Sequence, residues 1–498
     1  MKRTSGATQY FPLAKRQKPA AAWAAMAARK KRELKEDVED KKKKDTTVVV
    51  AVTSAGKAAA ASMVAKPPMP LSVSQQRVLR AAMSGESFFF TGAAGTGKSY
   101  VLKQLPGALA EKFGESTIFT TASTGIAACA IGGTTLHSFA GVGLGDGSVA
   151  ELLERLQNPK QPSYKKARAR WVMANVLIIE ECSMVPPDLF DKLDQIGRCL
   201  RGVFDKPFGG IQVILCGDFY QLPPVNKEKR PDQMDFIFET KSWNQLIGDK
   251  IYVLTEIFRQ KEPEFLNMLE DFRRGSIGDQ AMATFETRRR VTEMTSALPD
   301  DTVKLFSTRK EVEIVNNYNL DKLGGEIKNY DAVDRGEPFV VQKLADHWIT
   351  PQRLTLKVGA SVMFVFNVAM ELGISNGMTG KVVGFSDDKE FPIILCANGV
   401  QYTAEPVTWE IKSASIVIAA RTQIPLILSY AITTHKSQGM SINHVEVNTS
   451  NFFEHGQCYV ALSRGMTLEG LYIRGPLPAQ RLLHPHPKVV NWWQAISQ

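Results

Sequence analysis

The segment 92–99 constrains the fold of this chain more than any other stretch. Its sequence, GAAGTGKS, matches the pattern G-x-x-x-x-G-K-[ST] at every defined position. The apolar run 88–91 precedes it and a helical stretch, 100–105, follows it, so the glycines form a turn between a strand and a helix. In such a turn, backbone N–H groups surround a phosphate at the N-terminus of the helix. The chain is therefore expected to contain a parallel α/β domain with a nucleotide site.

The residues of this segment and of a later acidic pair have different expected roles at that site. Lys98 is placed to neutralise the β- and γ-phosphate oxygens, and the Ser99 hydroxyl is placed to ligate Mg²⁺. The buried-strand pattern 176–179 ends in two carboxylates, so we expect Glu180 to hold the Mg²⁺ shell and Glu181 to polarise the attacking water. The expected cofactors are ATP and Mg²⁺, with the nucleotide contacted by Gly92, Ala93, Ala94, Gly95, Thr96, Gly97, Lys98 and Ser99.

A further candidate lies in the segment 217–225, which follows the predicted strand 211–216. Gln221 in this segment could contact the γ-phosphate, although the pattern alone is equally typical of a Pro-rich turn. Another strand is predicted at 117–121. Around residues 354–420 the pattern changes to short β-type runs separated by Gly and Asn turns, which favours a small inserted barrel.

Composition narrows the class of protein. The chain has 498 residues, which predicts two to four domains, and none of its apolar runs approaches the roughly 20 residues that a membrane span requires. The six cysteines are scattered singly, which argues against a disulfide framework and a zinc site. Residues 1–66 hold 16 Lys+Arg and 6 Asp+Glu, whereas the other 432 residues hold 45 of each. Overall basicity is therefore no argument that the folded part binds nucleic acid.

The Lys-rich and Ala-rich segment 1–68 is predicted to be a disordered tail. Its clusters KRQK (15–18) and RKKR (29–32) are about ten residues apart and are typical of a bipartite nuclear-import signal. The absence of acidic residues in 1–32 leaves a mitochondrial transit peptide as the alternative. A solvated tail that only speeds association with DNA is the third. We expect a nuclear protein, with the mitochondrion as the alternative.

Taken together, these strings resemble those of the PIF-type (petite-integration-frequency) DNA helicases, in the PIF/RecD-like branch of helicase superfamily 1B. The resemblance covers about four fifths of the chain, from residue 71 to residue 473, with the motifs in family order. The segments that carry it are 71–75, 92–99, 121–128, 135–139, 176–181, 191–194 with 207–212, 217–225, 254–260, 356–360 with 376–380, 434–439 and 456–464.

The resemblance implies roles for residues that spacing alone does not assign. Gln75 would read the adenine, although Ser72 and Gln75 also form a capping-box pattern. Arg259 and Arg464 would bring positive charge to the transferring phosphoryl group, and Gly439 would contact the nucleotide. The residues implied to contact DNA, with bases stacking on the aromatic one, are Thr124, His137, Phe139, His435, Lys436 and Ser437.

The expected fold class is α/β, with two RecA-like P-loop domains, an SH3-like β-barrel inserted in the second, and the disordered tail. The first RecA-like domain is predicted at 69–250, with a small insertion near 140–170. The second is predicted at 251–350 and 421–475. The barrel is predicted at 351–420, and a C-terminal tail at 476–498.

The resemblance implies an ATP-dependent DNA helicase that moves 5′→3′ on single-stranded DNA and unwinds duplex or structured DNA in genome maintenance. Its expected partners are single-stranded and forked DNA, with a G-quadruplex or RNA–DNA hybrid also open, and it is expected to be a monomer that binds no membrane. The family usually has Asp at position 180, and the longer Glu180 could crowd the Mg²⁺ water shell. Two alternatives remain, a P-loop ATPase that remodels proteins and a catalytically weak DNA-binding scaffold. Stimulation of ATP hydrolysis by single-stranded DNA separates them.

Overall fold

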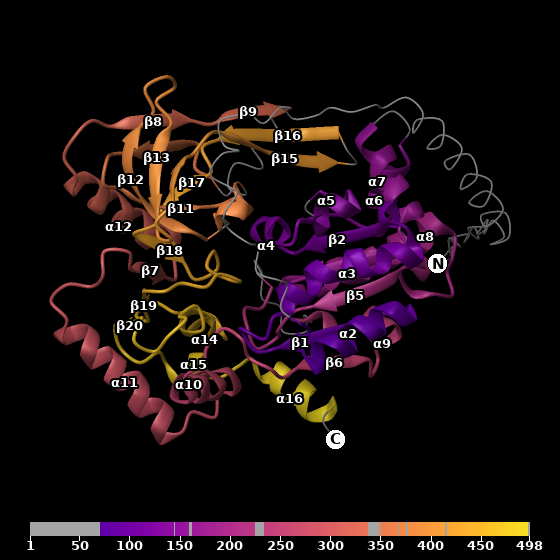
Figure 1. The fold of residues 1–498 in the computed structure, drawn as a ribbon. Helices are drawn as coiled ribbons and strands as arrows, with labels where there is room; N and C mark the ends of the chain where they lie inside the picture. The colour runs from indigo at the N-terminus through magenta and orange to yellow at the C-terminus, as the bar shows by residue number, and fades with distance from the viewer. Residues whose placement is uncertain are drawn as a thin grey trace, which may run out of the picture.

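The computed structural model describes residues 70–143, 145–158, 162–224, 234–336, 348, 350–366, 368–374, 377–413 and 416–496. The predicted N-terminal tail and its basic clusters lie outside these residues. The described chain forms two α/β lobes and a β-rich insertion, which lie at the right, lower left and upper left of Figure 1. This confirms the predicted α/β class.

The first lobe is built on a six-stranded sheet in the order β3-β2-β4-β5-β1-β6, with every neighbouring pair parallel. The four strands predicted from sequence are present within one or two residues of their expected bounds. The strands are β1 (Phe88–Gly92), β2 (Ile118–Ala122), β3 (Thr134–Thr135), β4 (Val176–Glu180), β5 (Gln212–Cys216) and β6 (Ile251–Leu254).

Burial on both faces explains why these strands read as continuous apolar runs. Phe88 and Phe90 pack into one core and Phe89 packs into the other, because successive side chains of a strand point to opposite faces. Helices cover both sides of the sheet (Figure 1). They are α2 (Val73–Ser84), α3 (Lys98–Phe113), α4 (Gly125–Ala130), α5 (Leu136–Ala140), α6 (Val149–Gln157), α7 (Pro162–Met173), α8 (Pro187–Arg201) and α9 (Lys241–Leu246).

The second lobe has a four-stranded parallel sheet in the order β18-β7-β19-β20. Its strands are β7 (Val303–Phe306), β18 (Ala431–Thr433), β19 (Val445–Asn448) and β20 (Leu471–Arg474). Its helices are α10 (Pro263–Arg274), α11 (Asp279–Met294), α12 (Arg309–Lys322), α14 (Gln457–Leu462) and α15 (Gln480–Leu483). This lobe has its own apolar core, so each lobe can keep its shape while the two move.

The insertion consists of antiparallel strands between β7 and β18. Five strands pair in the order β14-β13-β12-β11-β17, three in the order β15-β16-β9, and β10 pairs with β8. These strands are β8 (Lys328–Asp331), β9 (Val333–Gly336), β10 (Arg353–Leu356), β11 (Ser361–Phe364), β12 (Thr379–Phe385), β13 (Pro392–Cys396), β14 (Gln401–Thr403), β15 (Val407–Ser413), β16 (Ile416–Gln423) and β17 (Leu426–Leu428). Its β character agrees with the prediction, and its SH3-like identity stays a prediction.

Three predicted boundaries differ from the observed elements. The strand β6 pairs with β1 and therefore belongs to the first lobe, beyond the predicted limit at residue 250. The strands of the insertion run from 328 to 428, because β8, β9 and β17 pair with strands inside the predicted range 351–420. The predicted C-terminal tail is wrong, since residues 480–496 form α15 and α16 (Pro487–Ile496) and bury Leu482, Leu483 and Val489.

Short 3₁₀ turns complete the secondary structure. They are η2 (Glu115–Thr117), η3 (Cys182–Met184), η4 (Pro207–Gly210), η5 (Ile237–Glu239) and η7 (Met370–Leu372). None of the helices within the described ranges has the length and apolarity that a bilayer crossing requires.

Candidate functional site

The P-loop joins β1 to α3, as the sequence predicts. Gly97 caps α3 with φ 80°, in the left-handed region that glycine adopts without a steric penalty. A side chain at Gly95 would also be excluded, because a Cβ there would lie 2.8 Å from the Cβ of Arg259. The Lys98 ammonium donates to the carbonyls of Gly92, at 2.7 Å, and Ala93, at 3.1 Å. The loop therefore holds the lysine at the mouth of α3, where a phosphate would bind.

The first acidic residue lies at the carboxyl end of β4, next to the P-loop. Glu180 Oε1 accepts a hydrogen bond from the Ser99 hydroxyl at 2.8 Å, while Glu180 Oε2 is buried and has no hydrogen-bond partner. Burial, with the neighbouring charge of Glu181, raises the pKa of Glu180 to about 8. An unpartnered carboxylate oxygen beside a serine hydroxyl fits a divalent cation, which would supply the missing partner and favour the charged form.

The second acidic residue faces the other lobe. Glu181 is 9% exposed and has φ 53°, and its Oε2 accepts from the side-chain amide of Gln438 at 2.9 Å. Burial raises the pKa of Glu181, although the charges of Lys98 and Arg464 oppose the rise. The predicted base therefore belongs to the first lobe and is hydrogen-bonded by a residue of the second lobe. Sequence reasoning did not single out Gln438, although it lies inside the segment 434–439.

The two predicted arginines come from the second half of the chain and line the same cavity as the P-loop. Arg464 is 1% exposed; its Nε donates to the carbonyl of Val460 at 2.8 Å and its Nη2 to the hydroxyl of Ser463 at 2.7 Å. Arg259 donates to the carbonyl of Ser463 at 3.1 Å. Burial lowers the pKa of Arg464 to about 9 and also lowers that of Arg259. The phosphate charge of a nucleotide would offset the cost of burying two cations so close together.

The residues predicted to act together line one cavity of about 350 Å³ between the lobes. It contains the phosphate loop, both acidic residues, Gln221, Gly439 and both arginines. Its lining is Ala94, Gly95, Gly97, Lys98, Ser99, Tyr100, Glu180, Glu181, Cys216, Gly217, Gln221, Phe258, Arg259, Gly439, Ser441, Arg464 and Met466. Gly92, Ala93 and Thr96 complete the loop just behind this surface.

Gln75 lies behind the P-loop and is 2% exposed. It completes the predicted capping box, since its Oε1 accepts from the Ser72 backbone at 3.0 Å, and its Nε2 also donates to the carbonyl of Thr96 at 3.2 Å. The capping-box interpretation of this residue is therefore confirmed. Adenine recognition by Gln75 stays a prediction.

A buried ion pair that the sequence did not reveal joins the lobes beside the cavity. Asp218 is fully buried and binds Arg273 of α10 through contacts of 3.0 and 3.2 Å, and it also accepts from Gln221 Nε2 at 3.4 Å. Burial alone would raise the pKa of Asp218, but the Arg273 guanidinium and the Lys98 charge hold it below its ordinary value. One feature of the sequence could have indicated this pair. Arg273 lies four residues after Leu269, and this spacing places a cation on the apolar, buried face of α10.

A second contact between the lobes was also missed. The hydroxyl of Tyr459, on α14, accepts from the backbone N–H of Ala94 in the P-loop at 2.8 Å. Gly456, which caps the same helix, lies so close to the segment after β5 that a Cβ there would come within 2.5 Å of the Gln221 carbonyl. The helix of the arginine-bearing segment 456–464 is therefore seated directly against the nucleotide cavity.

The predicted DNA contacts of the first lobe are only partly compatible with the structure. Thr124 and His137 are half-buried near the carboxyl ends of β2 and β3. Phe139 is 1% exposed, with its ring centroid 5.1 Å from those of Phe119 and Trp171. The prediction that DNA bases stack on Phe139 is wrong, because the apolar face of α5 turns this ring into the core.

The predicted DNA contacts of the second lobe also divide. His435 and Lys436 are half-buried, and burial lowers the pKa of each; the His435 ring stacks on Phe453, which is 51% exposed. Ser437 is fully buried and donates its hydroxyl to the carbonyl of Thr434 at 2.8 Å. A DNA contact through the Ser437 side chain is therefore wrong, since that hydroxyl shapes the turn.

The segments 191–194 and 207–212 prove to be structural. The Asp194 carboxylate accepts from the backbone N–H of Phe208 at 2.5 Å and pairs with Arg198 at 2.9 Å. A Cβ on Gly197 would lie 2.9 Å from the carbonyl of Phe208, so this glycine permits α8 to approach η4. These two segments thus hold α8 and η4 against the start of β5, whose other end leads into the cavity.

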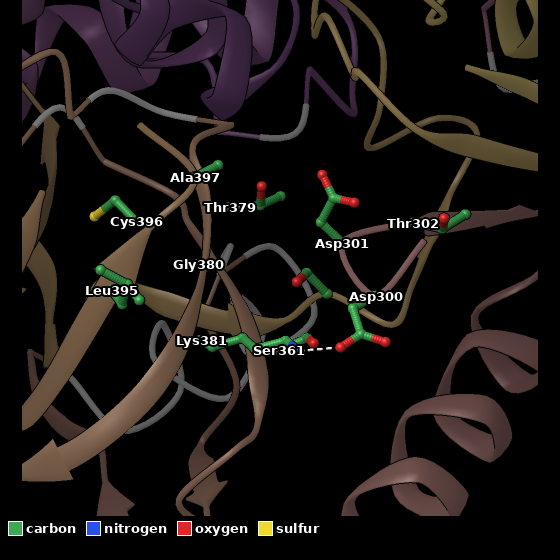
Figure 2. Close-up of a pocket in the computed structure, with 11 residues that line it drawn as sticks. Asp300, Asp301, Thr302, Ser361, Thr379, Gly380, Lys381, Leu395, Cys396 and Ala397 are labelled. Atoms are coloured by element: carbon green, nitrogen blue, oxygen red, sulfur yellow. Dashed lines mark hydrogen bonds and ion pairs between the residues drawn. The ribbon is translucent and has the colours of Figure 1, made fainter. Parts of the chain in front are cut away.

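A second cavity, of about 320 Å³, lies where the insertion meets the second lobe (Figure 2). It is lined by β11, β12, β13 and the residues 300–302, and Asp300 pairs with Lys381 across it at 2.7 Å. No residue predicted to act in nucleotide or DNA binding lines it.

Comparisons with known proteins agree with this geometry. A family model described as PIF1-like helicase matches residues 70–282, and one described as the 2B domain of DNA helicase Pif1 matches residues 342–385. The ATP-dependent DNA helicase PIF1 of Xenopus laevis is 40% identical over 430 residues, which cover 86% of this chain and 65% of the relative. The chain spans less than two thirds of the curated relatives it matches, and 60% of the human relative.

Solved structures give the same result. The crystal structure of Pif1 helicase from Candida albicans is 37% identical with a TM-score of 0.74, and the match covers 86% of this chain and 100% of that chain. A Bacteroides Pif1 structure, described as a complex with ADP-AlF3 and ssDNA, is 32% identical with a TM-score of 0.64 and is matched over 98% of its length. From this similarity and the shared arrangement of its motifs, the chain belongs to the PIF1-like helicase family.

Proposed function

We propose that this protein is an ATP-dependent DNA helicase that moves 5′→3′ along single-stranded DNA. The observation that carries the proposal is the cavity itself, which Lys98 and Glu181 of the first lobe line together with Arg464 of the second lobe and with Arg259, which lies between β6 and α10. Such a cavity is complete only when the lobes are together, so binding and loss of nucleotide would drive closing and opening. The family resemblance supports the proposed polarity.

Each part of the cavity has a task in hydrolysis. The P-loop amides and Lys98 would hold the β- and γ-phosphates, and the two arginines would stabilise the charge that spreads over the transferring phosphoryl group. Glu181 would accept a proton from the attacking water, with its carboxylate positioned by Gln438. Ser99 and the unpartnered Glu180 oxygen would hold Mg²⁺, which supplies charge neutralisation at the phosphates.

DNA would lie across the two lobes and contact the segment 434–439. Lys436 supplies positive charge there, and Gln438 in the same segment reaches Glu181. Contact with DNA at one end of this short segment would therefore bear on the catalytic base at the other. The Bacteroides relative is described with ssDNA and ADP-AlF3 together, which supports a single conformation that binds both.

The proposed substrates are single-stranded and forked DNA, and structured forms such as G-quadruplexes or RNA–DNA hybrids fall within the same proposal. One relative's structure is described as two coordinating Pif1 helicases at forked dsDNA. We propose a monomer as the basic unit, acting in replication, repair, recombination or telomere maintenance.

The test uses forked duplexes that carry only a 5′ or only a 3′ single-stranded tail, with ATP and Mg²⁺. We expect the 5′-tailed fork alone to open, and Lys98→Ala to abolish opening. Opening of the 3′-tailed fork would refute the polarity. If the protein binds DNA and neither fork opens, the catalytically weak scaffold becomes the better description, with Glu180 as the first residue to examine.

We further propose nuclear localisation, directed by the basic clusters 15–18 and 29–32. Replacing both clusters with alanines in a fluorescent fusion should abolish nuclear accumulation. A fusion that accumulates in mitochondria instead would overturn this proposal in favour of the alternative.

A further inference from the structure

The C-terminal residues cross from one lobe to the other. The helix α15 buries Leu482 and Leu483 in the core of the second lobe, while α16 buries Val489 in a core of the first. Only a few residues separate the two helices. Figure 1 shows the consequence, since the yellow α16 lies beneath β1 and β6 of the purple first lobe. We call α16 the interlobe strap.

Aromatic and ionic contacts fix the strap in place. The ring of Trp492 stacks on Phe238 at 4.6 Å with an interplanar angle of 10°, and it meets Phe219 edge-on at 5.3 Å. Lys488 pairs with Asp235 at 2.9 Å and with Glu239 at 2.8 Å. A helix of ten residues would be marginal in isolation, so these contacts with the first lobe stabilise it where it lies.

The next residue of the strap reaches toward the nucleotide site. Trp493 lies parallel to Tyr220, with ring centroids 6.1 Å apart and an interplanar angle of 11°. Tyr220 belongs to the segment 217–225, and the guanidinium carbon of Arg273 lies 4.4 Å from the centre of its ring. Three side chains from the strap, the first lobe and the second lobe thus meet at one place.

From this stack the contacts lead into the cavity. Arg273 makes a two-pronged ion pair with the fully buried Asp218, and Asp218 accepts a hydrogen bond from Gln221, which lines the nucleotide cavity. A planar guanidinium makes such a pair only when its plane is correctly oriented. The Tyr220 ring packs against that guanidinium, and Trp493 stacks on the ring.

We propose that Trp493 is a positioning residue for ATP hydrolysis, acting through Tyr220, Arg273 and Asp218 to hold Gln221 in the nucleotide cavity. Through these contacts the interlobe strap contributes to the catalytic step. This inference rests on the proposed ATPase activity and adds to it a residue that lies outside every motif of the resemblance.

The test measures DNA-stimulated ATP hydrolysis by the full chain. Trp493→Ala should lower kcat by about tenfold and change KM for ATP by less than about twofold, because a displaced γ-phosphate contact impairs the reaction more than binding. Trp493→Phe, which can still stack on Tyr220, should restore most of the rate. Tyr318→Ala is the matched control, since Tyr318 is an exposed aromatic next to Lys322 on α12 and should leave the rate unchanged.

A double-mutant cycle separates positioning from general stability. In a Gln221→Ala background, Trp493→Ala should lower kcat by less than about twofold, because the group it positions is already gone. If the double variant instead loses the product of the two single-variant losses in kcat, the inference is overturned. A Trp493→Ala rate equal to that of the wild type would also overturn it. If Trp493→Ala does not fold, Tyr220→Leu removes the same stack from the other side and enters the same cycle. A wild-type chain without ATPase activity would instead refute the proposed function, and this inference with it.

Discussion

The first lobe lines the nucleotide cavity with residues that directly follow its own parallel strands, whereas the second lobe lines it with residues that turns and helix ends hold in place. Lys98 begins α3 after the loop that follows β1, Glu180 ends β4, and Glu181 is the next residue. Arg464 follows the short helix α14, and its donors are taken up by the carbonyl of Val460 and the hydroxyl of Ser463. The residues of the first face are positioned by the strands of a single sheet. The residues of the second face reach the cavity only when the two lobes are packed together.

This difference suggests that the two faces do different work. We expect the first-lobe face to bind nucleotide even with the lobes apart, because its loop and its carboxylates belong to the same sheet. The second-lobe face adds charge only when the lobes are together, which is where positive charge lowers the barrier to phosphoryl transfer. Substitutions on the first face should therefore weaken both binding and hydrolysis, and those on the second face should mainly slow hydrolysis.

The largest effect is expected for Lys98→Ala. Loss of the ammonium beside the phosphates should lower the hydrolysis rate by about a thousandfold or more and weaken nucleotide binding as well. Steady-state hydrolysis and binding of a fluorescent ADP analogue would measure the two effects. Lys112→Ala at the far end of α3 is the control and should leave the rate unchanged, because its ammonium donates to the Met83 carbonyl, lies over the Phe113 ring and does not line the cavity.

A somewhat smaller effect is expected for Arg464→Lys. An ammonium cannot reproduce the guanidinium contacts with Val460 and Ser463, so single-turnover hydrolysis should fall by about a hundredfold or more with ADP affinity nearly unchanged. Arg288→Lys, on the same lobe but outside the cavity, is the control. An equal loss of ADP affinity would show that the second face contributes to binding after all.

The ion pair between the lobes should contribute to stability. Asp218→Asn leaves Arg273 buried without its counter-charge and should lower the free energy of unfolding by about 3 kcal/mol. Because the pKa of Asp218 is held below its ordinary value, the pair stabilises the protein above about pH 4 and loses this effect as the pH falls through the folded-state pKa. Denaturant unfolding of the wild type and of Asp218→Asn at pH 7 and at several values below about pH 4 would detect both, and an equal acid dependence of the two proteins would contradict the assignment.

The smallest effect is expected at the position where this chain departs from its family. Glu180→Asp shortens the carboxylate and leaves more room for the water shell of Mg²⁺, so we expect kcat to rise by about threefold at saturating Mg²⁺. A titration of ATPase activity with Mg²⁺ measures it. Glu181→Asp is the matched comparison and should lower the rate, because it withdraws the base from Gln438. A fall of more than tenfold for Glu180→Asp would mean that the longer side chain is required.

Several parts of the site are predictable from the amino-acid sequence alone. The P-loop, the acidic pair and the strands that carry them are local patterns, in which residues close in sequence are also close in space. Gln221, Arg259, Gly439 and Arg464 needed the family resemblance, since nothing in their spacing says that they meet. The errors at Phe139 and Ser437 have one cause, because a motif names the residues of a turn or helix without saying which of them faces inward.

The sequence by itself determined the α/β class, the phosphate loop and its carboxylates, because strand periodicity and glycine geometry act over a few residues. Only the tertiary structure decided that Arg273 neutralises Asp218, that Gln438 and Tyr459 reach across the lobes, and that the last helix straps the first lobe. Each of these joins residues at least 55 positions apart. Contacts of that range depend on how whole lobes pack, and no local pattern records them.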